Sequence, residues 1–91
     1  MGFLFEWDQE KNNKLIKERQ VSFEAVVSHV EDGHVLAIAE GRGKYAHQKQ
    51  FILEMNGYVY AVPFVEKEGR VFLKTIIPSR KMTRKYFLGE I

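Results

Sequence analysis

The sequence contains no cysteine and no long apolar run. The absence of cysteine excludes a disulfide framework, a thiolate metal site and a cysteine nucleophile, and it fits a reducing compartment. No stretch is long enough to predict a membrane span. The N-terminal segment "MGFLFEWDQEK" meets acidic residues at once and lacks the basic start and longer apolar stretch of a signal peptide. We therefore expect a cytoplasmic protein that does not contact a membrane.

Acidic residues are absent from one long segment. Between Gly69 and Gly89 there is no Asp or Glu but six Lys and Arg. The whole chain divides in the same way, with four basic and eight acidic residues in positions 1–40 and ten basic and four acidic residues in positions 41–91. This asymmetry predicts either a polyanion or an acidic protein as partner.

The chain has the composition of a small folded domain. Its 91 residues are 45% hydrophobic, and 12 of them are Phe, Tyr or Trp. Two independent cores would leave each half too small for burial to offset chain entropy. We therefore expect one domain over residues 1–91.

The first half of the sequence favours a strand and two helices. Apolar residues alternate over 3–7, and Asp8 is placed to cap a helix that ends near Arg19. Ser22 is placed to cap a second helix, whose stripe of Phe23, Val26, Val27 and Val30 predicts burial on one side. Asp32-Gly33 ends that helix, and a strand is expected over 34–39.

The second half favours hairpins followed by a short helix. Asn56-Gly57 between two apolar runs indicates a type I′ turn, and Pro63 suggests an edge strand or a bulge. A last strand is expected over 70–77, and Ser79 is placed to cap a final helix. The expected order, β-α-α-β-β-β-β-α, is an α+β fold with helices on one face of an antiparallel four-stranded meander.

The segment "IIPSRKMTRKYF" contains the densest group of cations. In a helix, Arg80 would face Arg84 and Lys81 would face Lys85, so each like-charged pair would repel unless an anion is present. Met82 and Tyr86 have the same spacing and are expected to anchor the helix to the sheet. From these residues alone, a solvated helix face and a phosphate site both remain open.

The polar loop "EGRGKYAHQKQ" is a second source of candidates. It gathers Arg42, Lys44, His47 and Lys49 in a short space, where an imidazole could act as acid or base or bind phosphate. The three histidines lack the spacing of a zinc site. We therefore expect no metal and no cofactor.

Three segments together resemble a known family. "FEWDQEKN" at 5–12, "VSFE" at 21–24 and "IIPSRKMTRKY" at 76–86 are similar to the BrnT family of type II toxins. The sequence departs from the family pattern at Glu18-Arg19-Gln20, where the family has K-H-G, and it lacks the acid that commonly follows the closing Thr. The resemblance implies a RelE-like fold, ribonuclease activity, an RNA substrate and a cognate antitoxin with a ribbon-helix-helix DNA-binding part.

The resemblance also suggests roles for the candidate residues. Cleavage by the RNA 2′-hydroxyl needs a base, an acid and cations that stabilise the phosphorane. Arg80 and Arg84 are the candidates for phosphate stabilisation, and Tyr86 is a candidate for base stacking or proton donation. The catalytic candidates are Arg80, Arg84, His47, Lys49 and Tyr86, and the RNA-binding candidates are Lys74, Lys81, Lys85, Arg42 and Lys44.

Two other classes of function stay open at this point. A non-catalytic nucleic-acid-binding module would also need a basic C-terminal half. A protein-interaction module would use the same cations to receive an acidic partner. A homodimer and a toxin–antitoxin hetero-oligomer are both compatible with the sequence.

Overall fold

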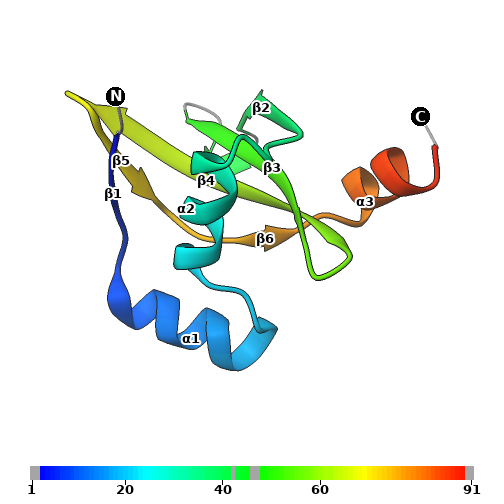
Figure 1. Cartoon of the computed structure of the whole chain (residues 1–91), viewed down its shortest axis with the longest axis horizontal. Helices are drawn as coiled ribbons and strands as arrows, with labels where there is room; N and C mark the ends of the chain where they lie inside the picture. The colour runs from blue at the N-terminus through cyan, green and yellow to red at the C-terminus, as the bar shows by residue number, and fades with distance from the viewer. Residues whose placement is uncertain (1–2, 42, 46–47, 90–91) are drawn as a thin grey trace.

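The computed structural model describes residues 3–41, 43–45 and 48–89. Within these ranges it has three α-helices, one 3-10 helix and six strands (Figure 1). In chain order they are β1 (Leu4–Glu6), α1 (Gln9–Arg19), α2 (Phe23–Glu31), β2 (Ala37–Glu40), η1 (Gly43–Tyr45), β3 (Lys49–Met55), β4 (Tyr58–Lys67), β5 (Arg70–Leu73), β6 (Ile77–Pro78) and α3 (Arg80–Phe87). The α+β class expected from the sequence is confirmed.

The strands form one mixed sheet in the order β1-β5-β4-β3-β2, and β6 also pairs with β4. Strands β2 to β5 are antiparallel neighbours, as the expected meander requires. The sheet is larger than expected, because β1 joins it in parallel beside β5. Glu6 and Arg70 form an exposed ion pair across that junction, and the hydrogen bond and charge of Glu6 raise the pKa of Arg70.

Helices α1 and α2 cover one face of the sheet, and α2 lies over β4 in Figure 1. The side chains that point to this face alternate along the strands, as in Leu53 of β3 and Val62 of β4, which are fully buried. Phe23 and Val26 of α2 are also fully buried against them, whereas Val27 and Val30 are only partly buried. The main core therefore lies between this helix pair and the sheet.

The N-terminal caps of α1 and α2 are those expected from the sequence. The Asp8 carboxylate accepts from the Glu10 amide at 2.9 Å, and Ser22 Oγ accepts from the Ala25 amide at 3.1 Å. A contact not expected from the sequence joins the two helices. Asn12 is fully buried, and its Oδ1 accepts from the Phe23 amide at 2.8 Å. The Asn12 side chain of α1 therefore gives a hydrogen-bond partner to the Phe23 amide, which has none within α2.

The strand expected over 34–39 begins later, at Ala37. The His34 amide donates to the His29 carbonyl at 2.8 Å, and the Gly33 amide donates to the Val30 carbonyl at 3.1 Å, with Gly33 at φ +76°. These two bonds are a Schellman motif, which closes the last turn of α2. His34 is therefore part of the helix terminus and is unavailable to the sheet.

The hairpin around Asn56-Gly57 is confirmed. Both residues have positive φ, 56° and 78°, as a type I′ turn requires. β3 and β4 pair in register from Met55 opposite Tyr58 to Lys49 opposite Phe64. This hairpin is the centre of the sheet.

The last strand expected over 70–77 is interrupted. Leu73 of β5 lies opposite Phe64, and Ile77 of β6 lies opposite Ala61, so three residues, 74–76, face two residues of β4. The extra residue breaks the alternation, and Thr75 and Ile76 are both buried. Of the two alternatives expected at Pro63, the edge strand is wrong, because β4 lies between β3 and β5. A bulge is present, in residues 74–76 opposite Val62 and Pro63. The Pro63 carbonyl accepts a hydrogen bond from the Lys74 amide. The nitrogen of the same residue points to the same side, toward the interruption, where a missing N–H leaves no strand pairing unmade.

Candidate functional site

Helix α3 begins at a cap that the sequence predicts. Ser79 has an extended backbone, and its Oγ accepts from the Met82 amide at 3.1 Å. The Ser79 carbonyl accepts from the amide of Thr83 at 3.0 Å and from its hydroxyl at 2.7 Å. The first turn of α3 is therefore fixed by its own side chains.

Three residues attach α3 to the sheet. The Thr83 hydroxyl accepts from the Val59 amide at 2.9 Å, and the Ser79 amide donates to the Val59 carbonyl at 2.9 Å. Met82 packs against a small apolar cluster of Ile52, Val59 and Ala61. These residues alternate with those of the main core, so α3 lies on the face opposite α1 and α2. The expectation that the helices share one face is therefore wrong for α3. Figure 1 shows α3 at one end of the sheet, away from the helix pair.

The anchoring fixes the direction of the cations of α3. At 100° per residue, Met82 and Thr83 occupy the sheet side, and the four cations occupy the other side. All four are exposed: Arg80, Lys81, Arg84 and Lys85. The Lys85 ammonium lies 5.7 Å from the centre of the Tyr86 ring. We call these four side chains the cationic face of α3, which can contact successive phosphates of a polyanion.

Tyr86 does not have the anchoring role expected for it. Its side chain is 38% exposed, and Phe87 beside it is 49% exposed. Thr83 is the second anchor instead. The sequence gives a weak signal for this role, since Thr83 lies one helical turn after the cap at Ser79. Tyr86 lies on the same side of the helix as Met82, one turn later, and its ring is accessible next to the Lys85 ammonium.

The other sequence candidates belong to other segments of the chain than α3. Lys49 is exposed and lies opposite Phe64 of β4. Phe64 is five residues from Val59, to which α3 is attached, so the two positions are about 16 Å apart along the strand. Lys74 is exposed, and its ammonium lies 5.4 Å from the ring of Phe72. Lys44 is exposed on η1. Arg42 and His47 lie outside the described residues.

The histidines that the structure describes have ordinary surroundings. His29 Nδ1 lies 2.8 Å from the Ala25 carbonyl, one turn earlier in α2, and its ring meets that of His34 edge-on at 6.5 Å. No group of three or more His, Asp and Glu side chains gathers in the described ranges.

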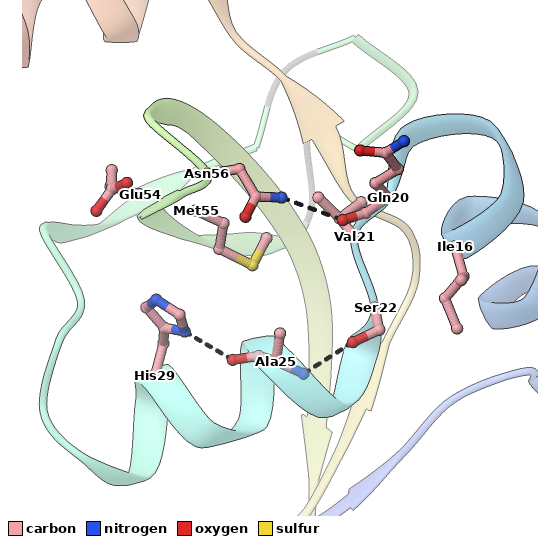
Figure 2. Close-up of a pocket in the computed structure, with 9 residues that line it drawn as sticks. All are labelled: Ile16, Gln20, Val21, Ser22, Ala25, His29, Glu54, Met55 and Asn56. Atoms are coloured by element: carbon pink, nitrogen blue, oxygen red, sulfur yellow. Dashed lines mark hydrogen bonds between the residues drawn. The ribbon is translucent and has the colours of Figure 1, made fainter.

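A groove lies between the end of α1, α2 and the β3–β4 turn (Figure 2). It has a volume of about 470 Å³ and is lined by Ile16, Gln20, Val21, Ser22, Ala25, His29, Glu54, Met55 and Asn56. Its polar side chains bind backbone groups: Asn56 Nδ2 donates to the Gln20 carbonyl, and Glu54 accepts from the Gly57 amide. None of these lining residues is Lys or Arg. The groove is thus poorly suited to a polyanion.

The structure defines a small α+β protein that presents an anchored helix with four exposed cations, an arrangement suited to RNA. The comparison with protein families gives the same class. The model of the ribonuclease toxin BrnT of type II toxin–antitoxin systems matches residues 7–85. The chain therefore belongs to the BrnT family, and this membership implies an RNA substrate and an antitoxin partner.

No curated protein and no solved structure matches the chain significantly. In the ranges that the structure describes, none of the helices is long and apolar enough to cross a membrane.

Proposed function

We propose that the chain is a metal-independent endoribonuclease that inhibits translation by cleaving RNA. The observation that carries the proposal is the cationic face of α3, which Ser79, Met82 and Thr83 hold in a fixed direction. A fixed guanidinium stabilises developing charge without reorganising during the reaction, and this preorganisation is what phosphoryl chemistry needs.

The proposed reaction is a transfer within the RNA strand. A base removes the proton from a ribose 2′-hydroxyl, whose oxygen forms a bond to the adjacent phosphorus. The bond from phosphorus to the 5′ oxygen of the next nucleotide breaks, and an acid gives that oxygen a proton. The products are a 2′,3′-cyclic phosphate and a free 5′-hydroxyl. No oxidant, reductant or cofactor is consumed.

Arg80 and Arg84 are the proposed cations at the scissile phosphate, since both are exposed on one side of α3 and a guanidinium binds phosphate through two N–H groups. Lys49 and His47 are the proposed proton-transfer or positioning groups, and Tyr86 is proposed to stack on a base. The proposed RNA-binding residues away from the scissile phosphate are Lys74, Lys81, Lys85, Arg42 and Lys44.

We further propose that a cognate antitoxin with a ribbon-helix-helix part neutralises the toxin in the cytoplasm, as a hetero-oligomer. An acidic antitoxin segment would complement the cations of the C-terminal half. Residues 1–91 are proposed to act as one RelE-like toxin domain. The helix pair on one sheet face and the C-terminal helix on the other support that description.

The central test is the double substitution Arg80→Ala and Arg84→Ala. Both side chains are exposed, so the fold should be kept, while growth inhibition on induced expression and cleavage of RNA should be lost. The matched control is Lys17→Ala with Lys67→Ala, which removes the same charge from exposed positions elsewhere. Retained cleavage in the arginine variant would overturn the role proposed for Arg80 and Arg84.

Two further measurements test the remaining parts. Cleavage should continue in excess chelator, and loss of cleavage there would refute the metal-independent mechanism. Co-expression with the protein encoded beside the gene should restore growth and yield a copurifying complex. RNA binding by the folded protein without cleavage of any RNA would favour a non-catalytic module.

A further inference from the structure

A second cavity lies between α1 and the segment that joins β5 to β6. It has a volume of about 300 Å³. Three parts of the chain line it: α1, residues 75–77 and η1. The lining side chains are Lys11, Lys14, Leu15, Glu18, Arg19, Lys44, Thr75 and Ile77. Four of these side chains are cations and one is an acid, so the cavity has an excess of positive charge.

The spacing along α1 explains why its cations meet in this cavity. Lys11, Lys14 and Glu18 follow one another at i, i+3 and i+7, and so lie on one side of the helix. Leu15 lies on the same side and is 3% exposed, so this side of α1 packs against the core. Lys17 is exposed but does not line the cavity.

Arg19 is held in place by the opposite wall. Its Nη1 donates to the Ile76 carbonyl at 2.7 Å, across 57 positions of the sequence. This bond uses one of the five N–H donors of the guanidinium. The bond ties the end of α1 to the interrupted strand and fixes a positive charge at the cavity wall.

The interruption between β5 and β6 shapes the other wall. Because residues 74–76 include an extra residue, Thr75 turns inward and is 6% exposed, and it is among the residues that line the cavity. Lys44 reaches the same cavity from η1. A hydroxyl and several ammonium and guanidinium groups around one hollow are the groups that bind phosphate oxygens.

We propose that this cavity binds a phosphate group of the RNA substrate, separate from the phosphate bound by the cationic face of α3. The proposal rests on the proposed function for the nature of the ligand. Concentrated positive charge in a concave site attracts anions more strongly than the same charge spread over a convex surface. Glu18 lowers the net charge but leaves the cations in excess.

The cavity and the start of α3 are neighbours along the chain, although α3 lies on the opposite face of the sheet. Ile77 lines the cavity and Arg80 begins α3, so their Cα atoms are at most about 11 Å apart. The two surfaces are joined by β6, which is fixed to β4 by pairing at Ala61 and Tyr60. A phosphate bound in the cavity would therefore hold the RNA at a point separate from α3, and losing it should weaken binding without removing the cations of α3.

The test compares two double variants. The cavity variant carries Lys11→Gln and Lys14→Gln, and the control variant carries Lys17→Gln and Lys67→Gln. Both pairs remove two exposed charges, but only the first removes them from the cavity. Binding of a labelled oligonucleotide with 2′-deoxyribose is measured by anisotropy over a range of salt. This probe cannot be cleaved, so the result does not depend on catalysis.

We expect the cavity variant to bind about tenfold more weakly, and its log–log salt slope to fall by about 0.7, as for one lost contact to a single-stranded phosphate. The control pair should change both quantities much less. Equal losses in the two pairs would overturn the proposal, since they would indicate only a loss of general charge. Circular dichroism of each variant checks that the fold is kept.

Two other ligands are distinguished in the same experiment. Inorganic phosphate is titrated while amide signals of Lys11 and Thr75 are followed by NMR. Shifts with phosphate but no change in oligonucleotide binding for the cavity variant would assign the cavity to a free anion and overturn the RNA assignment. Weaker antitoxin binding with unchanged oligonucleotide binding would assign it to an acidic peptide and overturn it as well. If the folded original protein cleaves no RNA while the cavity variant loses binding, the proposed function fails and the cavity assignment stands.

Discussion

The Thr83 hydroxyl accepts a hydrogen bond from the Val59 amide at 2.9 Å and donates one to the Ser79 carbonyl at 2.7 Å. One small side chain therefore connects α3 both to its own first turn and to the central strand of the sheet. The direction of the four cations depends on this connection.

Replacing Thr83 by Val keeps the shape of the side chain and removes its hydroxyl. The Val59 amide then loses its partner, and we expect the free energy of unfolding to fall by about 1–3 kcal/mol. RNA cleavage should fall further than stability alone explains, because α3 is less well fixed. Urea unfolding and cleavage rates measure the two effects. Thr83→Ser keeps the hydroxyl and should behave nearly as the original protein.

Replacing Asn12 by Ala should destabilise the protein without touching the cations. Asn12 is fully buried, its Oδ1 accepts from the Phe23 amide, and its Nδ2 donates to Glu24 at 2.7 Å. Removing these groups leaves a buried amide unpaired and should cost about 2 kcal/mol. The neighbouring exposed Asn13 is the control. An equal loss for Asn13→Ala would contradict the assigned role.

The substitutions Tyr86→Phe and Tyr86→Ala separate base stacking from proton donation. The ring is 38% exposed beside Lys85, so we expect it to stack on an RNA base. Tyr86→Phe should keep RNA affinity and cleavage, and Tyr86→Ala should weaken binding about tenfold, the effect of losing one stacked base. If Tyr86→Phe instead abolishes cleavage at unchanged affinity, the phenol is a proton donor.

Gly57→Ala tests the turn that sets the register of the central hairpin. Gly57 has φ +78°, where an added Cβ would meet no other atom but the backbone itself is strained for any L residue. We expect a loss of about 1 kcal/mol in thermal or urea unfolding, with RNA binding unchanged. A neutral substitution would show that the turn adopts another conformation in solution.

The parts of the fold that depend on near neighbours could be predicted from the sequence. Asp8, Ser22 and Ser79 each cap a helix by bonding an amide two or three residues further on. Asn56-Gly57 forms its turn because both residues readily adopt positive φ. The class of fold and its central hairpin follow from these local rules together with the alternation of apolar residues.

The parts that depend on distant residues could not be predicted. Lys11 and Lys14 are visible as one side of a helix, but only the folded chain brings Lys44 and Thr75 to them. The partner of Thr83 lies 24 residues earlier, and the partner of Arg19 lies 57 residues later. The use of His34 in the end of α2 also escaped prediction, because Asp32-Gly33 indicates where a helix stops and says little about where the next strand starts.

The extra residue among 74–76 changes which positions of the chain point to each face of the sheet. Up to Leu73 the odd positions point to the main core, and after the interruption Ile76 is buried while Thr75 is also turned inward. Deleting one residue here would restore a one-to-one pairing, because two residues would then face Val62 and Pro63 and Ile77 would stay opposite Ala61. Ser79 and Thr83 would keep Val59, and α3 would stay on its own side of the sheet. A single-codon deletion at this point should therefore alter the buried segment that carries Thr75 and Ile76 while leaving the basic surface of α3 in place.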